Sequence, residues 1–440
     1  MTTITSRLRL ACCIGAATLA ATPAFAEAAP PKIDAGDTAW MIAATGLVLL
    51  MSIPGLALFY CGMVRKKNVL ATMAQTLLCV MLCSVLWAIA GYTLAFNGDG
   101  ALIGNFDKLM LRGIDMMSVA PSTSIPEMLF MIYQMTFAVI TVALVAGSVA
   151  DRMRFSAFIW FAALWLFLVY VPIAHWVWGG GWLTTDVMAK KDGVLDFAGG
   201  TVVHLNAGIA GLVAAYVLGK RYGYGSENFA PYDLSLAVIG TGLLWVGWYG
   251  FNGGSALGAN SRAAFAIVAT HLAACMGALT WMALEWWTRG KPSVLGMISG
   301  AIAGLGTITP ASGFVLPWHG VVIGLAAGAI CFWACTKLKL RCGYDDSLDV
   351  FGVHGVGGAT GTFLTGVFAA AAVGETAGLI EGNARQLLYQ VYGIVAVLVW
   401  SGVATFVILK VINLFVPLRV NDETERSGLD ISLHGESIHS

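Results

Sequence analysis

Two histidines are the residues of this sequence whose type and setting best suit the handling of a proton. His204 lies in the segment DFAGGTVVHLNAG, residues 196–208, and His354 lies in DVFGVHGVGGATGTFLTG, residues 349–366. Each follows an aspartate, Asp196 or Asp349, that can cap free N–H groups where a helix begins. A neutral imidazole has one donor and one acceptor, so two facing imidazoles can share a proton. Spacing alone leaves open the alternative that each histidine only bonds a neighbouring helix and stabilises the fold.

The sequence around these histidines favours neither a metal site nor an enzyme active site. Zinc and copper require a third or fourth ligand, and neither segment has a carboxylate or thiol one helical turn from its histidine. The polar segments lack the nucleophile and base that a catalytic site needs. The nine cysteines follow no CxxC or zinc spacing and are expected to be free thiols. We therefore expect no metal, no cofactor and no enzymatic activity.

The composition indicates a protein that is largely surrounded by lipid. Hydrophobic residues make up 58% of the chain and charged residues 11%, whereas a typical soluble domain has about 25% charged residues. A soluble protein of this length could not bury so much apolar surface. The formal net charge is zero and there is no long basic run, which argues against nucleic acid as a partner.

The first 26 residues resemble a secretory signal. Arg7 and Arg9 precede the apolar run LACCIGAATLAA, and the small residues AFA at 24–26 suit cleavage. The run is too short to span a membrane, although a short first membrane helix is the alternative. Cleavage predicts that the mature chain begins outside the cell.

Eleven apolar runs follow, and each is a candidate for the roughly 20 residues that a spanning helix needs. They begin near Trp40, Leu70, Glu127, Phe155, Phe197, Leu234, Ala263, Val294, Phe314, Asp349 and Leu387. The predicted fold is an all-α polytopic membrane protein with eleven transmembrane helices in residues 27–417. The run that begins at Val294 is short.

The basic residues of the loops predict the orientation of these spans. Six Lys or Arg residues fall in the predicted outer loops, and twelve fall in the predicted cytoplasmic loops. The twelve are Arg65, Lys66, Lys67, Arg152, Arg154, Lys220, Arg221, Arg289, Lys291, Lys337, Lys339 and Arg341. The N-terminus is therefore expected outside, and the tail of residues 418–440 in the cytoplasm.

The odd number of spans predicts two five-helix halves of opposite orientation, roughly residues 38–220 and 232–372, and one extra helix at 387–417. Transporters with inverted repeats place their sites near the membrane midplane, where the halves meet. His204 would lie roughly 12 Å from the outer face and His354 about 8 Å from the inner face, at 1.5 Å per residue. The two histidines thus approach the middle from opposite sides. His271 has neither a carboxylate at its helix start nor such a partner, so we expect it to be structural.

Seven segments, in order, resemble the ammonium transporter family (Amt/Mep/Rh), and specifically its bacterial Amt branch. They are FYCGMVRKKNVL, IYQMTFAVIT, DRMRF, PIAHWVWGGGWL, DFAGGTVVHLNAGIAGL, GWYGFNGGSALGAN and DVFGVHGVGGATGTFLTG. The resemblance implies a homotrimer in the bacterial cytoplasmic (inner) membrane, with one eleven-helix pore per subunit. It also implies that ammonium or ammonia is the substrate, and it favours a pathway role for the histidines.

The resemblance implies a role for each matched residue. His204 and His354 correspond to the pair that lines the family's apolar pore. Phe137 and Phe251 correspond to stacked phenylalanines that close its outer mouth. Phe137, Trp178 and Ser255 correspond to an outer ammonium-binding site. Asp196 and Trp248 correspond to supporting residues near the outer vestibule and the pore.

The polar tail resembles the family's regulatory tail, next to which PII-type signal proteins dock in bacterial relatives. The expected function is uptake in which ammonium is captured, deprotonated and conducted as ammonia. The alternative is an ammonium sensor that acts through a cytoplasmic partner. A carbon dioxide channel, as proposed for the Rh branch, is a weaker third possibility because the aromatic site favours the Amt branch.

Overall fold

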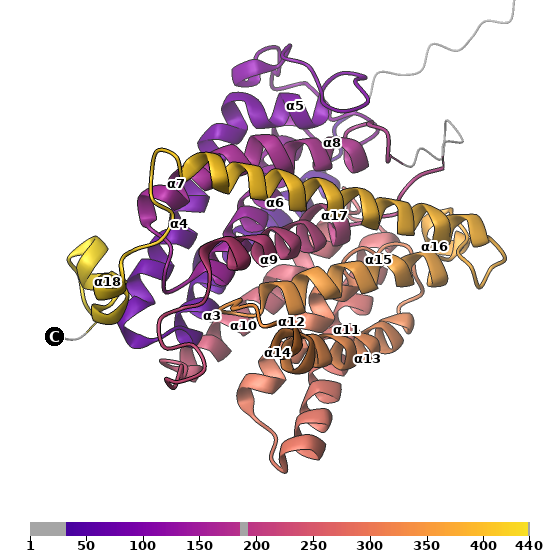
Figure 1. The fold of residues 1–440 in the computed structure, drawn as a ribbon. Coiled ribbons are helices and arrows are strands. Elements are labelled where there is room, and N and C mark those ends of the chain that lie inside the picture. Colours follow the sequence, from indigo (N-terminus) through magenta and orange to yellow (C-terminus); the bar gives the residue numbers. More distant parts are fainter. Residues whose placement is uncertain (1–31, 185–191, 439–440) are drawn as a thin grey trace, which may run out of the picture. The chain divides into compact units, whose positions relative to one another are not determined.

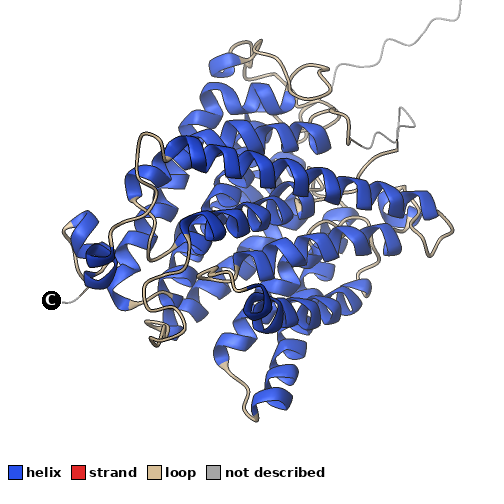
Figure 2. Ribbon diagram, viewed as in Figure 1, coloured by secondary structure: helices blue, strands red, loops and turns tan. Residues whose placement is uncertain are grey.

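The computed structural model describes residues 32–184 and 192–438, and all regular secondary structure in these two ranges is helical (Figure 2). The described residues from Ile33 onward form one compact unit with a large buried apolar core. The predicted leader, residues 1–26, lies outside the described residues.

Five helical runs occupy the first half of the chain, at the places where the hydropathy pattern predicts spans. Several contain a short π-helical turn between two α-helices. The runs are Ala35–Met63 (α2, Ala35–Leu50, and α3, Leu56–Met63), Lys66–Phe96 (α4, Val69–Leu86, and α5, Tyr92–Phe96), Glu127–Val149 (α6), Phe155–Trp178 (α7, Phe155–Trp165, and α8, Val171–Trp178) and Gly200–Leu218 (a π turn, Gly200–Leu205, and α9, Asn206–Leu218).

The second half continues the same pattern and ends in the tail. Its elements are α10 (Leu234–Trp248) with the π turn Tyr249–Gly253, α11 (Ser261–Arg289), α12 (Val294–Ile308), α13 (His319–Trp333) with the π turn Ala334–Leu338 and α14 (Lys339–Cys342), the π turn Phe351–Gly355 with α15 (Val356–Phe368), α16 (Ala371–Gly374), α17 (Ala384–Ile412), α18 (Asp422–Ser427) and the π turn Asp430–His434.

In the part of the chain that the structure describes, nine helices are long and apolar enough to cross a membrane. The chain is therefore a multi-pass membrane protein. The two other predicted spans coincide with α12, which has 15 residues, and with α15 and its preceding π turn. The extra helix, predicted at 387–417, extends over Ala384–Ile412.

Glycines allow the segments around the two histidines to cross at close range. A Cβ atom on Gly208 would lie 2.2 Å from the Cα of Gly355, and one on Gly358 would lie 2.6 Å from the carbonyl oxygen of Gly200. Side chains would keep these backbones apart. Helix α17 packs across both α9 and α15 and covers this crossing (Figure 1).

Candidate functional site

His204 and His354 meet inside the helix bundle. Their Nδ1 atoms lie 3.2 Å apart, and their rings are nearly parallel, at 14°. Both are buried, with 2% and 4% of their surface exposed. The sequence predicted that the two histidines approach the middle from opposite ends, and the structure brings them into contact.

Each histidine lies in a π-helical turn, Gly200–Leu205 or Phe351–Gly355. Such turns occur often at functional sites. In the Nδ1–Nδ1 hydrogen bond one ring donates and the other accepts, so the two Nε2 atoms have opposite roles. Nε2 of His204 has no hydrogen-bond partner among the described residues. The pair therefore offers a donor and an acceptor to a small molecule beside it.

A narrow apolar cavity of about 10 Å³ lies beside the histidines. This volume is close to the minimum for a single water molecule. Its walls include His204, His354, Phe251, Trp248 and several aliphatic side chains. An unpaired ion in such a place would lose most of its hydration energy. The cavity therefore suits a small neutral molecule better than a dehydrated ion.

Phe137 and Phe251 form a stacked pair at one end of this cavity. Their ring centroids are 4.2 Å apart with an interplanar angle of 26°, and both side chains are buried. The ring of Phe251 is also 6.2 Å from that of His204. The predicted gate pair is thus adjacent to the predicted histidine pair.

On the other side of the phenylalanine pair is a larger cavity of about 460 Å³, here called the Trp178 cavity. Phe137, Trp178 and Ser255 all line it, so the three predicted binding residues share one space. The Trp178 ring meets that of Phe137 edge-on at 5.7 Å. Ser255 Oγ donates to the carbonyl oxygen of Phe251 at 2.8 Å, which leaves its lone pairs as acceptors.

Tyr133 supports the contact between the two phenylalanines, and the sequence did not predict this role. Its hydroxyl group contacts the carbonyl oxygens of Gly250 and Phe251 at 3.0 and 2.9 Å. Tyr133 comes from the same helix as Phe137, one turn earlier, and its ring packs edge-on against it. It therefore holds the backbone of one gate phenylalanine beside the other.

Asp196 caps the turn that carries His204. Its carboxylate accepts hydrogen bonds from the backbone N–H groups of residues 199, 200, 201 and 202 and from the Thr201 hydroxyl. Its own carbonyl oxygen accepts from Nε1 of Trp178 at 2.8 Å. Asp196 thus joins the predicted binding site to the histidine turn.

Trp248 lies directly against His204. The two rings stack at 19° with centroids 5.5 Å apart. The indole Nε1 donates to Thr309 Oγ1 at 2.9 Å, which fixes the orientation of the ring. Trp248 therefore lies beside the histidine pair and lines the narrow cavity.

The expectation that Asp349 caps the turn of His354 is wrong. Asp349 Oδ1 accepts from Lys339 Nζ at 2.7 Å, and among the described residues the Asp349 carboxylate does not cap a backbone N–H group of this turn. Asp346 supplies the cap instead, since its Oδ2 accepts from Phe351 N at 2.7 Å. The reason is a backbone change at Asp349, where φ is +57° and the chain enters the helix from a left-handed conformation.

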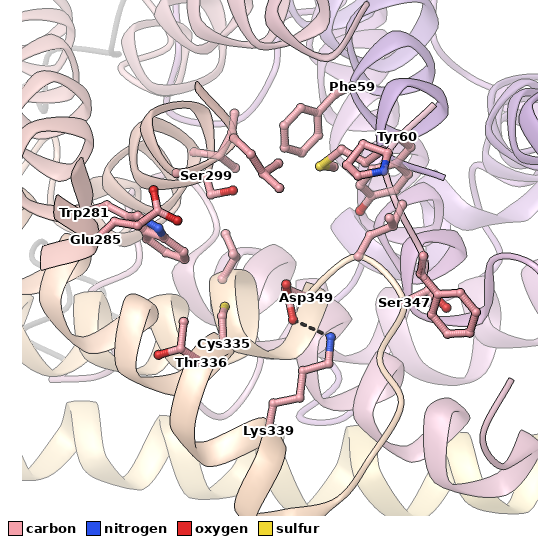
Figure 3. Close-up of a pocket in the computed structure, with 18 of the residues that line it drawn as sticks. Phe59, Tyr60, Trp281, Glu285, Ser299, Cys335, Thr336, Lys339, Ser347 and Asp349 are labelled. Atoms are coloured by element: carbon pink, nitrogen blue, oxygen red, sulfur yellow. Dashed lines mark hydrogen bonds and ion pairs between the residues drawn. The ribbon is translucent and has the colours of Figure 1, made fainter. Parts of the chain in front are cut away.

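A second large cavity, of about 420 Å³, lies beyond His354 and is here called the Asp349 cavity. Figure 3 shows Lys339 and Asp349 joined in it, opposite Glu285, Trp281 and Ser299. The four features are adjacent to one another in order. The Trp178 cavity meets the phenylalanine pair, this pair meets the narrow cavity, and the narrow cavity shares His354 with the Asp349 cavity.

His271 does not line any of these three cavities. Its Nδ1 bonds the Tyr249 hydroxyl at 2.7 Å on the exposed side of α11. Within residues 32–184 and 192–438, no group of three or more His, Cys, Asp or Glu side chains is arranged to hold a metal ion.

The tail docks on the rest of the protein. Glu425 is buried, and its carboxylate accepts from Tyr222 N at 2.6 Å and from Arg419 at 2.7 Å. Asn68 Oδ1 accepts from Leu429 N at 2.9 Å. The tail is therefore packed on the segments that lie between the helices, rather than simply solvated.

Comparison with known proteins identifies close relatives. The sequence model of the Ammonium Transporter Family matches residues 39–438. The chain is 47% identical to an ammonium transporter of Bacillus subtilis over 406 residues, which cover 92% of this chain and 98% of the relative. It is also 47% identical to an ammonium transporter of Aquifex aeolicus over 418 residues, covering 94% of this chain and 96% of that one.

Solved structures of similar fold also match this chain. The crystal structure of Candida albicans Mep2 matches with a TM-score of 0.81 at 38% identity, and the match covers 89% of this chain and 88% of that one. A structure described as a sensor Amt protein matches with a TM-score of 0.82 at 28% identity, covering 91% and 98% of the two chains.

Proposed function

We propose a route for ammonium through this chain, which belongs to the ammonium transporter family. In this route the Trp178 cavity captures ammonium, the ion loses a proton there, and ammonia passes Phe137 and Phe251 to reach the histidine pair. The observation that carries the proposal is the narrow apolar cavity between two large ones, with His204 and His354 as its polar groups.

The aromatic faces at the Trp178 cavity suit capture of a small cation. A cation over an aromatic ring gains about 2 kcal/mol or more when it is desolvated. The Ser255 hydroxyl can accept one N–H bond, which ammonium can donate and potassium cannot. Asp196 adds negative charge to the wall, although its oxygens bond the helix start.

Selectivity would then rest on deprotonation. Transfer of an unpaired ion into an apolar space is very costly, and a potassium ion has no proton to lose. Ammonia, once formed, can bond the imidazole nitrogens as it passes. The released proton either returns to the outer solution or crosses through the Nδ1–Nδ1 hydrogen bond, and the experiment below distinguishes these two cases.

We also propose the predicted topology for this route. It has eleven spans as two inverted halves plus α17, with the N-terminus outside after cleavage near Ala26 and the tail in the cytoplasm. In this orientation the Trp178 cavity faces outward and the Asp349 cavity faces inward. The assembly is a homotrimer in the bacterial inner membrane, and a PII-type protein is the proposed partner of the cytoplasmic face.

The test is to measure currents in liposomes that contain the purified protein, on a solid-supported membrane. An ammonium pulse is compared with a potassium pulse, for the wild type and for the double variant His204→Ala, His354→Ala. We expect current from ammonium and none from potassium, and the variant should lose either the current or this discrimination.

Two other outcomes are informative. If ammonium makes the liposome lumen alkaline without any current, the protein conducts neutral ammonia and the proton stays outside. If the wild type carries neither current nor ammonia, the transport proposal is overturned. The likeness to the sensor Amt protein would then favour a sensor that reports ammonium through the docked tail.

A further inference from the structure

The two histidine turns begin in different ways. The turn of His204 is capped by Asp196, whose carboxylate accepts from four successive backbone N–H groups. The turn of His354 has one such bond, from Phe351 N to Asp346. The His354 turn therefore needs a further support to be held as firmly.

Lys339 provides that support from a neighbouring helical run. Its Nζ donates to the carbonyl oxygen of Asp346 at 2.6 Å and to Asp349 Oδ1 at 2.7 Å. It thus bonds both ends of the loop 346–349, which leads directly into the turn of His354. Figure 3 shows this pair at the edge of the Asp349 cavity.

Both bonded residues connect onward to the histidine turn. Asp346 caps Phe351, and the carbonyl oxygen of Asp349 accepts from Val353 N at 2.9 Å. Asp349 also has a φ of +57°, a conformation that a residue with a side chain adopts at some energetic cost. A fixed partner for its carboxylate stabilises this conformation.

The environment of Lys339 makes the contact more than a surface ion pair. The side chains of Lys339 and Asp349 are 15% and 39% exposed. Asp346 is fully buried. Loss of the Lys339 ammonium removes the partner of a half-exposed carboxylate and also the hydrogen bond to the carbonyl oxygen of Asp346, and both losses loosen the loop 346–349.

We propose that Lys339 is a positioning residue for His354, which holds the loop 346–349 so that the two imidazoles stay within hydrogen-bond distance. This inference rests on the proposed role of the histidine pair in ammonium transport. It adds a residue that lines the Asp349 cavity and bonds the loop 346–349, without a hydrogen bond to either imidazole.

The test compares Lys339→Met and Lys339→Arg with the matched control Lys337→Met, because Lys337 is exposed, lies two residues away and does not line the Asp349 cavity. Two quantities are measured on folded, monodisperse protein. The first is the ratio of the ammonium-evoked to the potassium-evoked current. The second is the rate of amide hydrogen exchange in residues 350–356.

We expect Lys339→Met to lower the current ratio by roughly tenfold to a hundredfold, since displacements of about 1 Å at a reacting group have effects of that size. Exchange in residues 350–356 should become faster. Lys339→Arg should recover most of both properties because it keeps the charge and can bond both oxygens. Lys337→Met should match the wild type.

The proposal is overturned if folded Lys339→Met has the exchange rate and current ratio of the wild type, or if Lys339→Arg is as impaired as Lys339→Met. If Lys339→Met does not fold, Asp349→Asn replaces it and should show the same changes at smaller size, whereas wild-type behaviour would overturn the proposal. If the wild type itself carries no ammonium, the transport proposal fails, and the exchange rates alone then decide the positioning role.

Discussion

The imidazoles of His204 and His354 are stacked with their Nδ1 atoms 3.2 Å apart, although the two residues are 150 positions apart in the chain. This contact joins two helical runs that both line the narrow cavity. It also makes the hydrogen-bonding state of each ring dependent on the other.

We therefore expect His204→Ala and His354→Ala to have non-additive effects. Either change leaves the remaining buried imidazole without its ring partner, at a cost of about 1–3 kcal/mol. Each single variant should lose about as much ammonium current as the double variant. His271→Ala is the control and should keep the current. Losses that simply add would indicate that the two rings act independently.

Replacement of the aromatic wall should weaken ammonium capture. Trp178→Leu removes one ring face, and a cation–π contact of about 0.5–2 kcal/mol corresponds to a roughly 2- to 30-fold rise in the half-saturating ammonium concentration. Ser255→Ala should cause a smaller rise. The control is Trp160→Leu, since Trp160 is 56% exposed and does not line this cavity. Unchanged uptake at low ammonium would contradict the proposed capture site.

Asp196→Asn should lower the stability of the protein. The amide nitrogen cannot accept, so two or three of the five hydrogen bonds to the carboxylate are lost, and hydrogen bonds to a charged group contribute about 1.5–3 kcal/mol each. Thermal unfolding in detergent should shift to lower temperature, and Asp192→Asn, which changes an exposed carboxylate, should not shift it. A variant with normal unfolding but altered uptake would instead point to an electrostatic role for Asp196 in the cavity.

The buried ion pair between Arg221 and Asp345 is expected to make a pH-dependent contribution to stability. Burial would raise the pKa of Asp345, but the hydrogen bonds and charge of Arg221, with the charge of Arg152, lower the pKa below its ordinary value of 3.8. The pair therefore stabilises the fold above pH 3.8, and this contribution is lost as the pH falls further, through the lowered pKa.

Arg221→Met should cost about 3–5 kcal/mol at neutral pH because it leaves a buried carboxylate without its main partner. The cost should shrink as the pH is lowered, since the carboxylate of the variant is protonated more easily than that of the wild type. Chemical or thermal unfolding at several pH values measures the loss in the free energy of unfolding. The control is Lys220→Met, because Lys220 is the exposed neighbour of Arg221. A cost that does not vary with pH would exclude Asp345 as the responsible group.

The hydropathy and charge of the sequence were sufficient to predict the structural class of the protein. Apolar runs separated by basic loops predict a multi-pass helical membrane protein, because lipid leaves few alternatives for the backbone. The placement of His204 and His354 within two such runs also followed from the sequence, since helix rise converts residue number into depth.

The contacts at the site depended on the tertiary structure. The capping group of the His354 turn is Asp346 and not Asp349, because a left-handed residue turns the Asp349 carboxylate toward Lys339. Hydropathy contains no information on such a local change of backbone direction. The roles of Tyr133 and Lys339 were likewise not visible, since each acts on a segment that is distant in the sequence.

The sequence by itself thus determined which residue types lie in the long apolar helical runs and that the protein crosses the membrane several times. Only the tertiary structure decided which side chains meet, namely the two imidazoles, the stacked phenylalanines and the ion pair at Lys339. The physical reason is that burial in lipid acts on each residue separately and is nearly additive along the chain. A hydrogen bond or a ring contact instead requires two atoms to lie within a few ångströms, and that depends on how all the helices pack together.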